Sequence, residues 1–271
     1  MMGTLRWRLF LALRLVARGL YRSTRLVGFL AAGVLDQASL RRSIESEWAD
    51  FFANEREVRR GLWPWEQEFF ARFLESGSSL LVVGAGSGRD VLALTDGGYR
   101  VEGVELSRQS AERARQILAD SGMHAIIHTA AIEDWAPSGR YDAIVFSYYC
   151  YSYIPGAKRR VEILAKLREH LLPCGRILIS YLPNHGESRG MPIIEWLTWL
   201  MRSDWRPEPG DDLVGLGMQA PIRFHHTFGF EEIEAEALAA GLRVAWHETN
   251  PEALLVLECL ATGGSTTPTL R

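Results

Sequence analysis

The chain has 271 residues, of which 47% are apolar, so it is long enough for one large α/β domain with extensions and a sizeable core. Its formal net charge of -3 gives no global electrostatic reason to expect a nucleic-acid partner. The three cysteines are odd in number and far apart, which excludes a Cys-x-x-Cys pair or a metal-binding spacing and indicates reduced thiols in a cytoplasmic protein.

Residues 4–35 are predicted to form a basic amphipathic helix, because they contain six arginines and no acidic residue. On a helix with about 100° per residue, four arginines form one stripe opposite an apolar row. The stripe consists of Arg14, Arg18, Arg22 and Arg25, and the row consists of Leu9, Leu13, Val16, Leu20 and Val27. Arginines interrupt every apolar run, so we expect neither a spanning helix nor a secretory signal. The helix is expected either to pack on the protein or a second subunit, or to lie on an anionic membrane surface; a misplaced start codon is a third reading.

Two more helices are expected before the first strand, so that residues 1–76 form an N-terminal helical extension. Residues 37–60 read as a charged amphipathic helix, and the next helix begins at the sequence Trp63-Pro64-Trp65, with proline in its first turn. The two tryptophans are candidates for a lid over a ligand, with packing in an aromatic core as the alternative.

A glycine-rich loop follows the first predicted strand. Gly84, Gly86 and Gly88 stand at alternate positions between an apolar run and a helical pattern. Glycine permits a tight turn and the close approach of a ligand, and the free N–H groups of the following helix point at that ligand. The third glycine of the dinucleotide fingerprint G-x-G-x-x-G would fall on Arg89, which argues against an ordinary nicotinamide enzyme.

The second predicted strand, residues 100–105, ends in an acidic residue. Glu105 lies 17 positions after Gly88, at the carboxyl end of that strand. A carboxylate in this place can accept hydrogen bonds from both ribose hydroxyls of an adenosine. Ser107 is the expected N-cap of the helix that follows.

These residues resemble the class I S-adenosylmethionine-dependent methyltransferases, from about Leu80 to Ser180. The resemblance implies S-adenosyl-L-methionine as cofactor, with Ile132 covering the adenine ring and Glu133 (or Asp134) bonding its amino group. It implies the cofactor-binding set Gly84, Ala85, Gly86, Gly88, Glu105, Leu106, Ile132, Glu133 and Ser147. One departure is Val82, because many members carry at that position an acid that helps to hold the loop or the methionine amino group.

The remaining pattern predicts an α/β fold. Short apolar runs alternate with helical patterns from Leu80 onward, which implies a parallel sheet with helices on both faces and a ligand at the carboxyl ends of the strands. Strands are expected near 80–83, 100–105, 125–129, 142–147 and 176–182, and helices near 88–97, 108–121 and 157–172. The resemblance implies a Rossmann-like, seven-stranded, mostly parallel sheet whose last two strands, 242–248 and 253–260, form an antiparallel pair. Residues 77–262 are the expected methyltransferase domain, residues 183–226 a substrate cap with a helix at 192–204, and residues 263–271 a disordered tail.

The expected chemistry is the transfer of a methyl group to an oxygen or nitrogen atom of a small, apolar or lipid-like molecule. Such a displacement depends on alignment, so the sequence should show a strong cofactor site and a weak catalytic signature. The candidate catalytic residues are His225 and Tyr148, with packing roles as the alternative, and no metal cluster is expected. Two other functions remain open: a non-catalytic S-adenosylmethionine-binding subunit of a larger assembly, and a nicotinamide-dependent oxidoreductase. We expect a cytoplasmic protein, peripheral to a membrane if residues 4–35 bind one, with no nucleic-acid partner.

Overall fold

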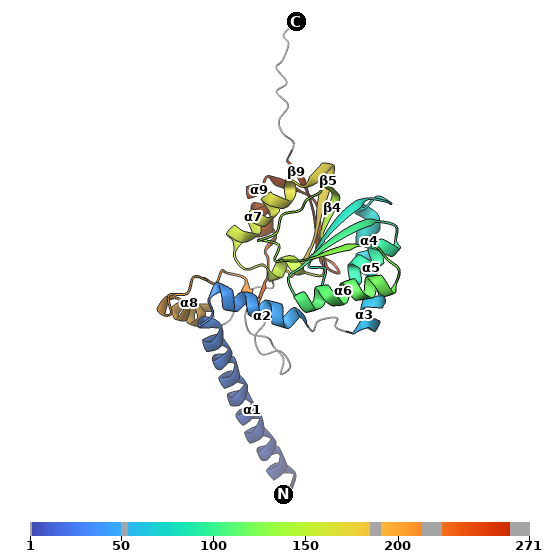
Figure 1. Cartoon of the computed structure of the whole chain (residues 1–271). Coiled ribbons are helices and arrows are strands. Elements are labelled where there is room, and N and C mark those ends of the chain that lie inside the picture. The colour runs from blue at the N-terminus through green and yellow to red at the C-terminus, as the bar shows by residue number, and fades with distance from the viewer. Residues whose placement is uncertain (1, 50–53, 185–190, 213–223, 261–271) are drawn as a thin grey trace. The chain divides into compact units, whose positions relative to one another are not determined.

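The structure is a computed structural model that describes residues 2–49, 54–184, 191–212 and 224–260 (Figure 1). The chain divides into two compact units, which are described separately below. One unit contains Met1–Ile44 and Gly186–His225, and the other contains Glu45–His185 and His226–Arg271. The N-terminal residues and the segment after the fifth strand therefore belong to the same unit, and the sheet belongs to the other.

The larger unit is built on a seven-stranded sheet with the order β3-β2-β1-β4-β5-β9-β8 (Figure 1). The strands are β1 (Ser79–Val83), β2 (Arg100–Glu105), β3 (Ile126–Thr129), β4 (Tyr141–Phe146), β5 (Leu171–Tyr181), β8 (Leu242–Glu248) and β9 (Ala253–Cys259). The first five pair in parallel, whereas β9 is antiparallel to both β5 and β8. This sheet confirms the predicted Rossmann-like fold, including the antiparallel pair at its end.

Both faces of the sheet are buried, because β1 alternates between two apolar clusters. Leu81 and Val83 belong to one cluster and Leu80 and Val82 to the other, and each is at most 1% exposed. Such double burial explains why the strand sequence is a continuous apolar run. The helices of this unit are α3 (Glu55–Arg59), α4 (Pro64–Phe73), α5 (Arg89–Asp96), α6 (Arg108–Asp120), α7 (Ala157–Arg168) and α9 (Phe230–Ala239), with a 3-10 turn at Cys150–Tyr153.

Several element boundaries differ from the sequence prediction. The strand expected near 176–182 is part of the longer β5, and the helix expected at 192–204 ends at Leu200. The helix predicted over 37–60 is α2 (Gln37–Ala49) and the short α3, and residues 50–53 between them lie outside the described residues. The helix predicted to continue to residue 172 ends at Arg168, because β5 begins at Leu171 and pairs there with Tyr141. The register then shifts, so that Ala143 pairs with Arg176.

The smaller unit contains α1 (Met2–Gly33), the beginning of α2, α8 (Met191–Leu200), β6 (Asp211–Asp212) and His225, which is the first residue of β7 (His225–His226). The C-terminal end of α1 packs on α8 so closely that a Cβ on Gly33 would lie 2.4 Å from the Cβ of Leu197. Asp36 then caps α2 by accepting a hydrogen bond from Ser39 N at 2.7 Å. Among the described helices, none combines the length and the apolar character that crossing a membrane requires.

Candidate active site

The glycine loop joins β1 to α5 in a conformation that requires glycine. Gly84, Gly86 and Gly88 have φ angles of +75°, +54° and +93°, a region that side chains with a Cβ rarely adopt. A Cβ on Gly84 would lie 2.5 Å from the Sγ of Cys150, and one on Gly88 would lie 3.1 Å from the Cβ of Ala114. Around Gly86, in contrast, no described atom would lie within 4 Å of an added Cβ. Packing therefore explains the first and third glycines, whereas the second faces open space that a ligand can occupy.

Glu105 ties the second strand to this loop. Its Oε2 accepts a hydrogen bond from the backbone N–H of Gly86 at 2.8 Å, and its Oε1 accepts one from Ser107 N at 2.8 Å. The side chain is 6% exposed, and burial raises the pKa of its carboxyl although both backbone bonds favour the ionised form. Each oxygen has a second lone pair. Glu105 can therefore accept two more hydrogen bonds from a diol without losing its hold on the loop.

The segment after β3 is held against the same edge. Ala130 N donates to the carbonyl of Glu105 at 2.9 Å, so the segment starts beside the acidic residue. The Nζ of Lys166, on α7, donates to the carbonyls of Ile132 at 2.5 Å and Glu133 at 3.1 Å. Ile132 is buried, Glu133 is half-buried, and Leu106 after β2 is half-buried as well.

Two tyrosines with a left-handed backbone conformation follow β4. Ser147 N donates to the carbonyl of Val83 at 3.0 Å, which places the end of β4 beside the glycine loop. Tyr148 and Tyr149 then have φ angles of 34° and 58°. Bulky residues in this region are strained, and such strain is common at functional sites. Burial raises the pKa of the Tyr148 hydroxyl, so near neutral pH this group is a hydrogen-bond donor and not a base.

A buried charged cluster lies beside the loop and was missed by the sequence prediction. Arg89 places Nη2 2.5 Å from Glu66 Oε1 and 2.5 Å from Asp90 Oδ1, and Ser147 Oγ donates a hydrogen bond to Asp90. The three charged residues are 5%, 1% and 1% exposed, respectively. The guanidinium also lies 5.4 Å from the centre of the Tyr148 ring. The cluster thus connects α4, the start of α5 and the end of β4.

The surroundings of Glu66 shift the pKa of its carboxyl. Burial raises its pKa to about 7, and the charge of Asp90 acts in the same direction, whereas Arg89 opposes both. Its other oxygen accepts a hydrogen bond from Trp63 N at 2.8 Å, as an acid at the third position of a helix often does. The sequence held two signals for this cluster: the capping glutamate of α4, and the Arg-Asp pair directly after Gly88.

The departure at Val82 now has a physical reason. Val82 is 0% exposed and belongs to the apolar cluster under α4, α5 and α6. A carboxylate there would lose its hydration without gaining a partner, which is costly. The carboxylates of Glu66 and Asp90 lie instead on the helices next to the loop.

The other candidate catalytic residue, His225, belongs to the smaller unit. Its Nε2 lies 3.9 Å from Asp212 Oδ2, and the side chain is half-buried. Cys150, at the edge of the loop, has a thiol whose pKa is raised by burial, which disfavours a nucleophilic thiolate.

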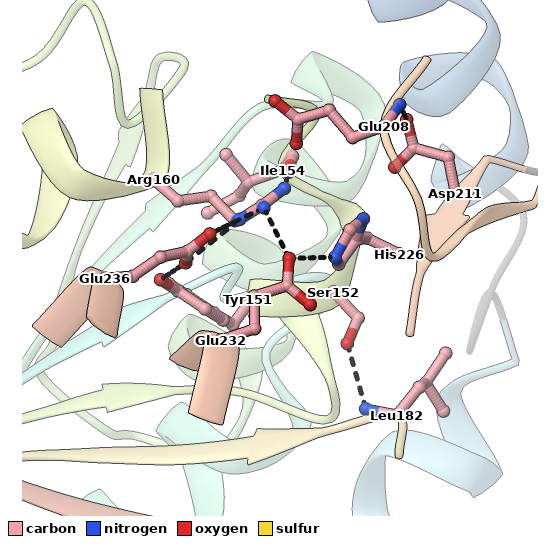
Figure 2. A network of polar contacts seen from close by, with 10 residues as sticks. All are labelled: Tyr151, Ser152, Ile154, Arg160, Leu182, Glu208, Asp211, His226, Glu232 and Glu236. Atoms are coloured by element: carbon pink, nitrogen blue, oxygen red, sulfur yellow. Dashed lines mark hydrogen bonds and ion pairs between the residues drawn. The ribbon is translucent and has the colours of Figure 1, made fainter. Parts of the chain in front are cut away.

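His226, the next residue along the chain, is buried in a polar network of the larger unit (Figure 2). It lies 2.8 Å from Glu232 Oε1, and that carboxylate lies 3.5 Å from the Nη2 of Arg160. Arg160 is 0% exposed, donates to both oxygens of Glu236 and lies 5.0 Å from the Phe228 ring centre. Buried charges of this kind require partners, and here they join α7 to α9. We therefore assign the network to the stability of the fold.

Comparison with known proteins agrees with this geometry. Residues 80–175 match the model of a family described as a methyltransferase domain. This match agrees with the resemblance of the chain to the class I S-adenosylmethionine-dependent methyltransferases. Comparison with curated proteins gave no significant match.

Solved structures share the fold of this methyltransferase domain. An S-adenosylmethionine-dependent methyltransferase from Methanosarcina mazei is 17% identical, with a TM-score of 0.56, and the match covers 74% of this chain and 99% of the other. CalS10, an amino pentose methyltransferase from Micromonospora echinaspora solved with S-adenosylmethionine bound, is 18% identical, with a TM-score of 0.53 and coverage of 74% and 93%. The sugar N-methyltransferase KedS8 from a Streptoalloteichus species is also 18% identical, with a TM-score of 0.52 and coverage of 78% and 88%. The family and these neighbours support S-adenosyl-L-methionine as the cofactor.

Proposed function

We propose that the protein is a methyltransferase that uses S-adenosyl-L-methionine to methylate an oxygen or nitrogen atom of a small molecule. The observation that carries this proposal is the pairing of Glu105 with the backbone of Gly86 at the carboxyl edge of a sheet that matches the methyltransferase family. This pairing leaves a buried carboxylate and an open glycine next to each other. Together they suit a ribose diol and a chain of atoms that passes close to the backbone.

The residues of the sheet edge suit the adenosyl half of the cofactor. Glu105 would accept hydrogen bonds from the two ribose hydroxyls, and Ile132 would cover one face of the adenine ring. The carboxylate of Glu133 or Asp134 would accept a hydrogen bond from the adenine amino group. When bound, the cofactor supplies a sulfonium methyl group that a nucleophile can displace.

The buried charged cluster suits the methionine half. The carboxylates of Glu66 and Asp90 are matched to an ammonium group, and Arg89 is matched to a carboxylate. Since the pKa of Glu66 is about 7, an ammonium group at this site would favour its ionised form. We therefore infer that these residues replace the acid that is absent at Val82.

The acceptor is inferred from chemistry at the end of β4. The Tyr148 hydroxyl would donate a hydrogen bond that orients the acceptor, because its raised pKa keeps it protonated. His225 remains a candidate base. Neighbours of the same fold methylate an amino pentose and a sugar nitrogen, which favours hydroxyl and amine acceptors as the first compounds to test. The expectation of an apolar or lipid-like acceptor rests on the tryptophan-rich segment after β5.

Calorimetry with S-adenosylhomocysteine and with NADH tests the cofactor. Binding of the first compound and not of the second is expected, and tight NADH binding alone would refute the proposal. Methyl transfer from radiolabelled cofactor to pooled amino sugars, phenols and lipids tests the activity. If S-adenosylhomocysteine binds and no acceptor in any pool is methylated, the non-catalytic subunit becomes the better explanation.

A further inference from the structure

Exposed apolar side chains gather in the smaller unit. Of the large hydrophobic residues that are exposed in the described part of the chain, ten lie between residues 10 and 34, five lie between residues 193 and 201, and only three lie elsewhere. Single exposed hydrophobic residues are ordinary, but contiguous ones mark a surface for a partner. The first group belongs to α1 and the residue after it, and the second group belongs to α8 and the residue after it.

The apolar row of α1 is exposed, as are all positions from 10 to 20 on every side of the helix. Leu13, Val16, Leu20 and Val27 are 59%, 59%, 65% and 64% exposed. At about 100° per residue these four positions fall within about 60° of one another around the helix. The structure therefore leaves uncovered the face that would be expected to pack on protein.

The contact of α1 with α8 uses the other side of the helix. Phe29 and Ala32 are buried, and Gly33 contacts Leu197 closely. At about 100° per residue these positions project on the same side as Arg14 and lie away from the apolar row. Packing within the unit and the exposed apolar row are therefore compatible, and the row remains available for a partner.

Helix α8 adds a second apolar face with aromatic residues. Trp196, Trp199 and Leu200 are 58%, 67% and 52% exposed, whereas the opposite side of the helix is buried through Ile194 and Thr198. Trp199 and Leu200 line a shallow hollow together with two exposed arginines, Arg202 and Arg206. At about 100° per residue Trp199 projects about 160° away from Leu197, which contacts α1, so this face of α8 does not continue the apolar row of α1.

The charge of this surface selects the kind of partner. Residues 1–35 contain six of the 30 basic residues and none of the 33 acidic residues, so this segment is strongly cationic in a chain with a net charge of -3. A cationic amphipathic helix that is not apolar enough to span a bilayer suits an anionic lipid surface.

We propose that α1 is a membrane-docking helix, which lies in the headgroup region of an anionic lipid bilayer. Leu13, Val16 and Leu20 enter the acyl boundary, and Arg14 and Arg18 face the phosphates. This inference does not depend on the proposed methyl transfer, because it concerns a different unit of the chain.

Cosedimentation of the full chain with lipid vesicles tests the proposal. Vesicles that contain phosphatidylglycerol and phosphatidylcholine should retain the protein, and vesicles of phosphatidylcholine alone should retain it about tenfold less well, because each phosphate contact is electrostatic. Leu20→Asp should lower retention about tenfold or more. The matched control is Leu11→Asp, which makes the same change of charge on the arginine side of α1 and should lower retention to a clearly smaller extent.

Three outcomes would overturn the proposal. The first is that the wild-type chain fails to sediment with the anionic vesicles. The second is that the two leucine variants lose retention equally. The third is that sedimentation equilibrium shows a dimer that Leu20→Asp dissociates, while no vesicle is bound. Because both leucines are exposed, circular dichroism and S-adenosylhomocysteine binding should remain at wild-type values in these variants.

Discussion

Replacing Glu105 by glutamine should weaken the binding of S-adenosylhomocysteine by a calculable amount. The carboxylate accepts hydrogen bonds from Gly86 N and Ser107 N, each at 2.8 Å. Its remaining lone pairs are the proposed acceptors for the ribose hydroxyls. Glutamine retains one acceptor oxygen, so one charge-assisted bond to the ribose is lost, which costs about 1.5–3 kcal/mol. That loss corresponds to about a 10-fold to 150-fold higher Kd by titration calorimetry.

The same substitution has a separate effect on folding. Either orientation of the glutamine amide leaves one of the two backbone N–H groups without its acceptor, which costs about 1–3 kcal/mol of stability in urea unfolding. The matched control is Glu102→Gln on the same strand, because Glu102 accepts a hydrogen bond from the Tyr141 hydroxyl at 2.7 Å. This control should lose stability and retain ligand binding within about twofold. Wild-type affinity in the Glu105 variant would refute the assignment of Glu105 to the ribose.

Three further substitutions test other parts of the larger unit. Folding raises the pKa of Glu66 from an ordinary 4.5 to about 7, so the unfolded chain releases this proton first and stability is lost as the pH rises through that window. Glu66→Gln should therefore gain stability relative to wild type between about pH 5 and pH 8, by up to about 3 kcal/mol in urea titrations; a difference that does not change with pH would contradict the assignment. Arg160→Met removes the cationic partner of the buried Glu236 carboxylate, to which the Tyr151 hydroxyl still donates a hydrogen bond, and should cost about 3–5 kcal/mol of unfolding free energy; a loss below about 1 kcal/mol would show that the network is dispensable. Gly88→Ala puts a side chain at a φ of +93° against α6 and should lower the thermal midpoint by several degrees, whereas an unchanged midpoint would mean that the loop adopts another conformation.

Much of the sheet could be predicted because the signals are local. The strands Arg100–Glu105 and Leu242–Glu248 were predicted with the bounds that the structure shows, and the glycine loop was placed between β1 and α5. Apolar runs, alternation and glycine positions depend only on neighbouring residues. The end of α7 was predicted less well, because it is decided by the pairing of Leu171 with Tyr141, a strand distant in sequence.

The charged cluster could not be predicted because its members come from different elements. Glu66 and Arg89 are 23 positions apart, and only the packing of α4 beside α5 brings them to 2.5 Å. The neighbouring histidines show the same limit. His226 is buried against Glu232, whereas His225 pairs with Asp212, and nothing in the order of two adjacent histidines decides which one is buried.

The sequence by itself determined the α/β fold, the position of the glycine loop and the segregation of arginines from leucines along α1. Each of these follows from periodicity or from the backbone freedom of glycine, which are properties of short segments. Tertiary structure alone decided that Val82 is buried among apolar side chains, and that the apolar row of α1 faces away from α8. Burial is a property of contacts between distant segments, so a pattern can show which face of a helix is apolar without showing what covers it.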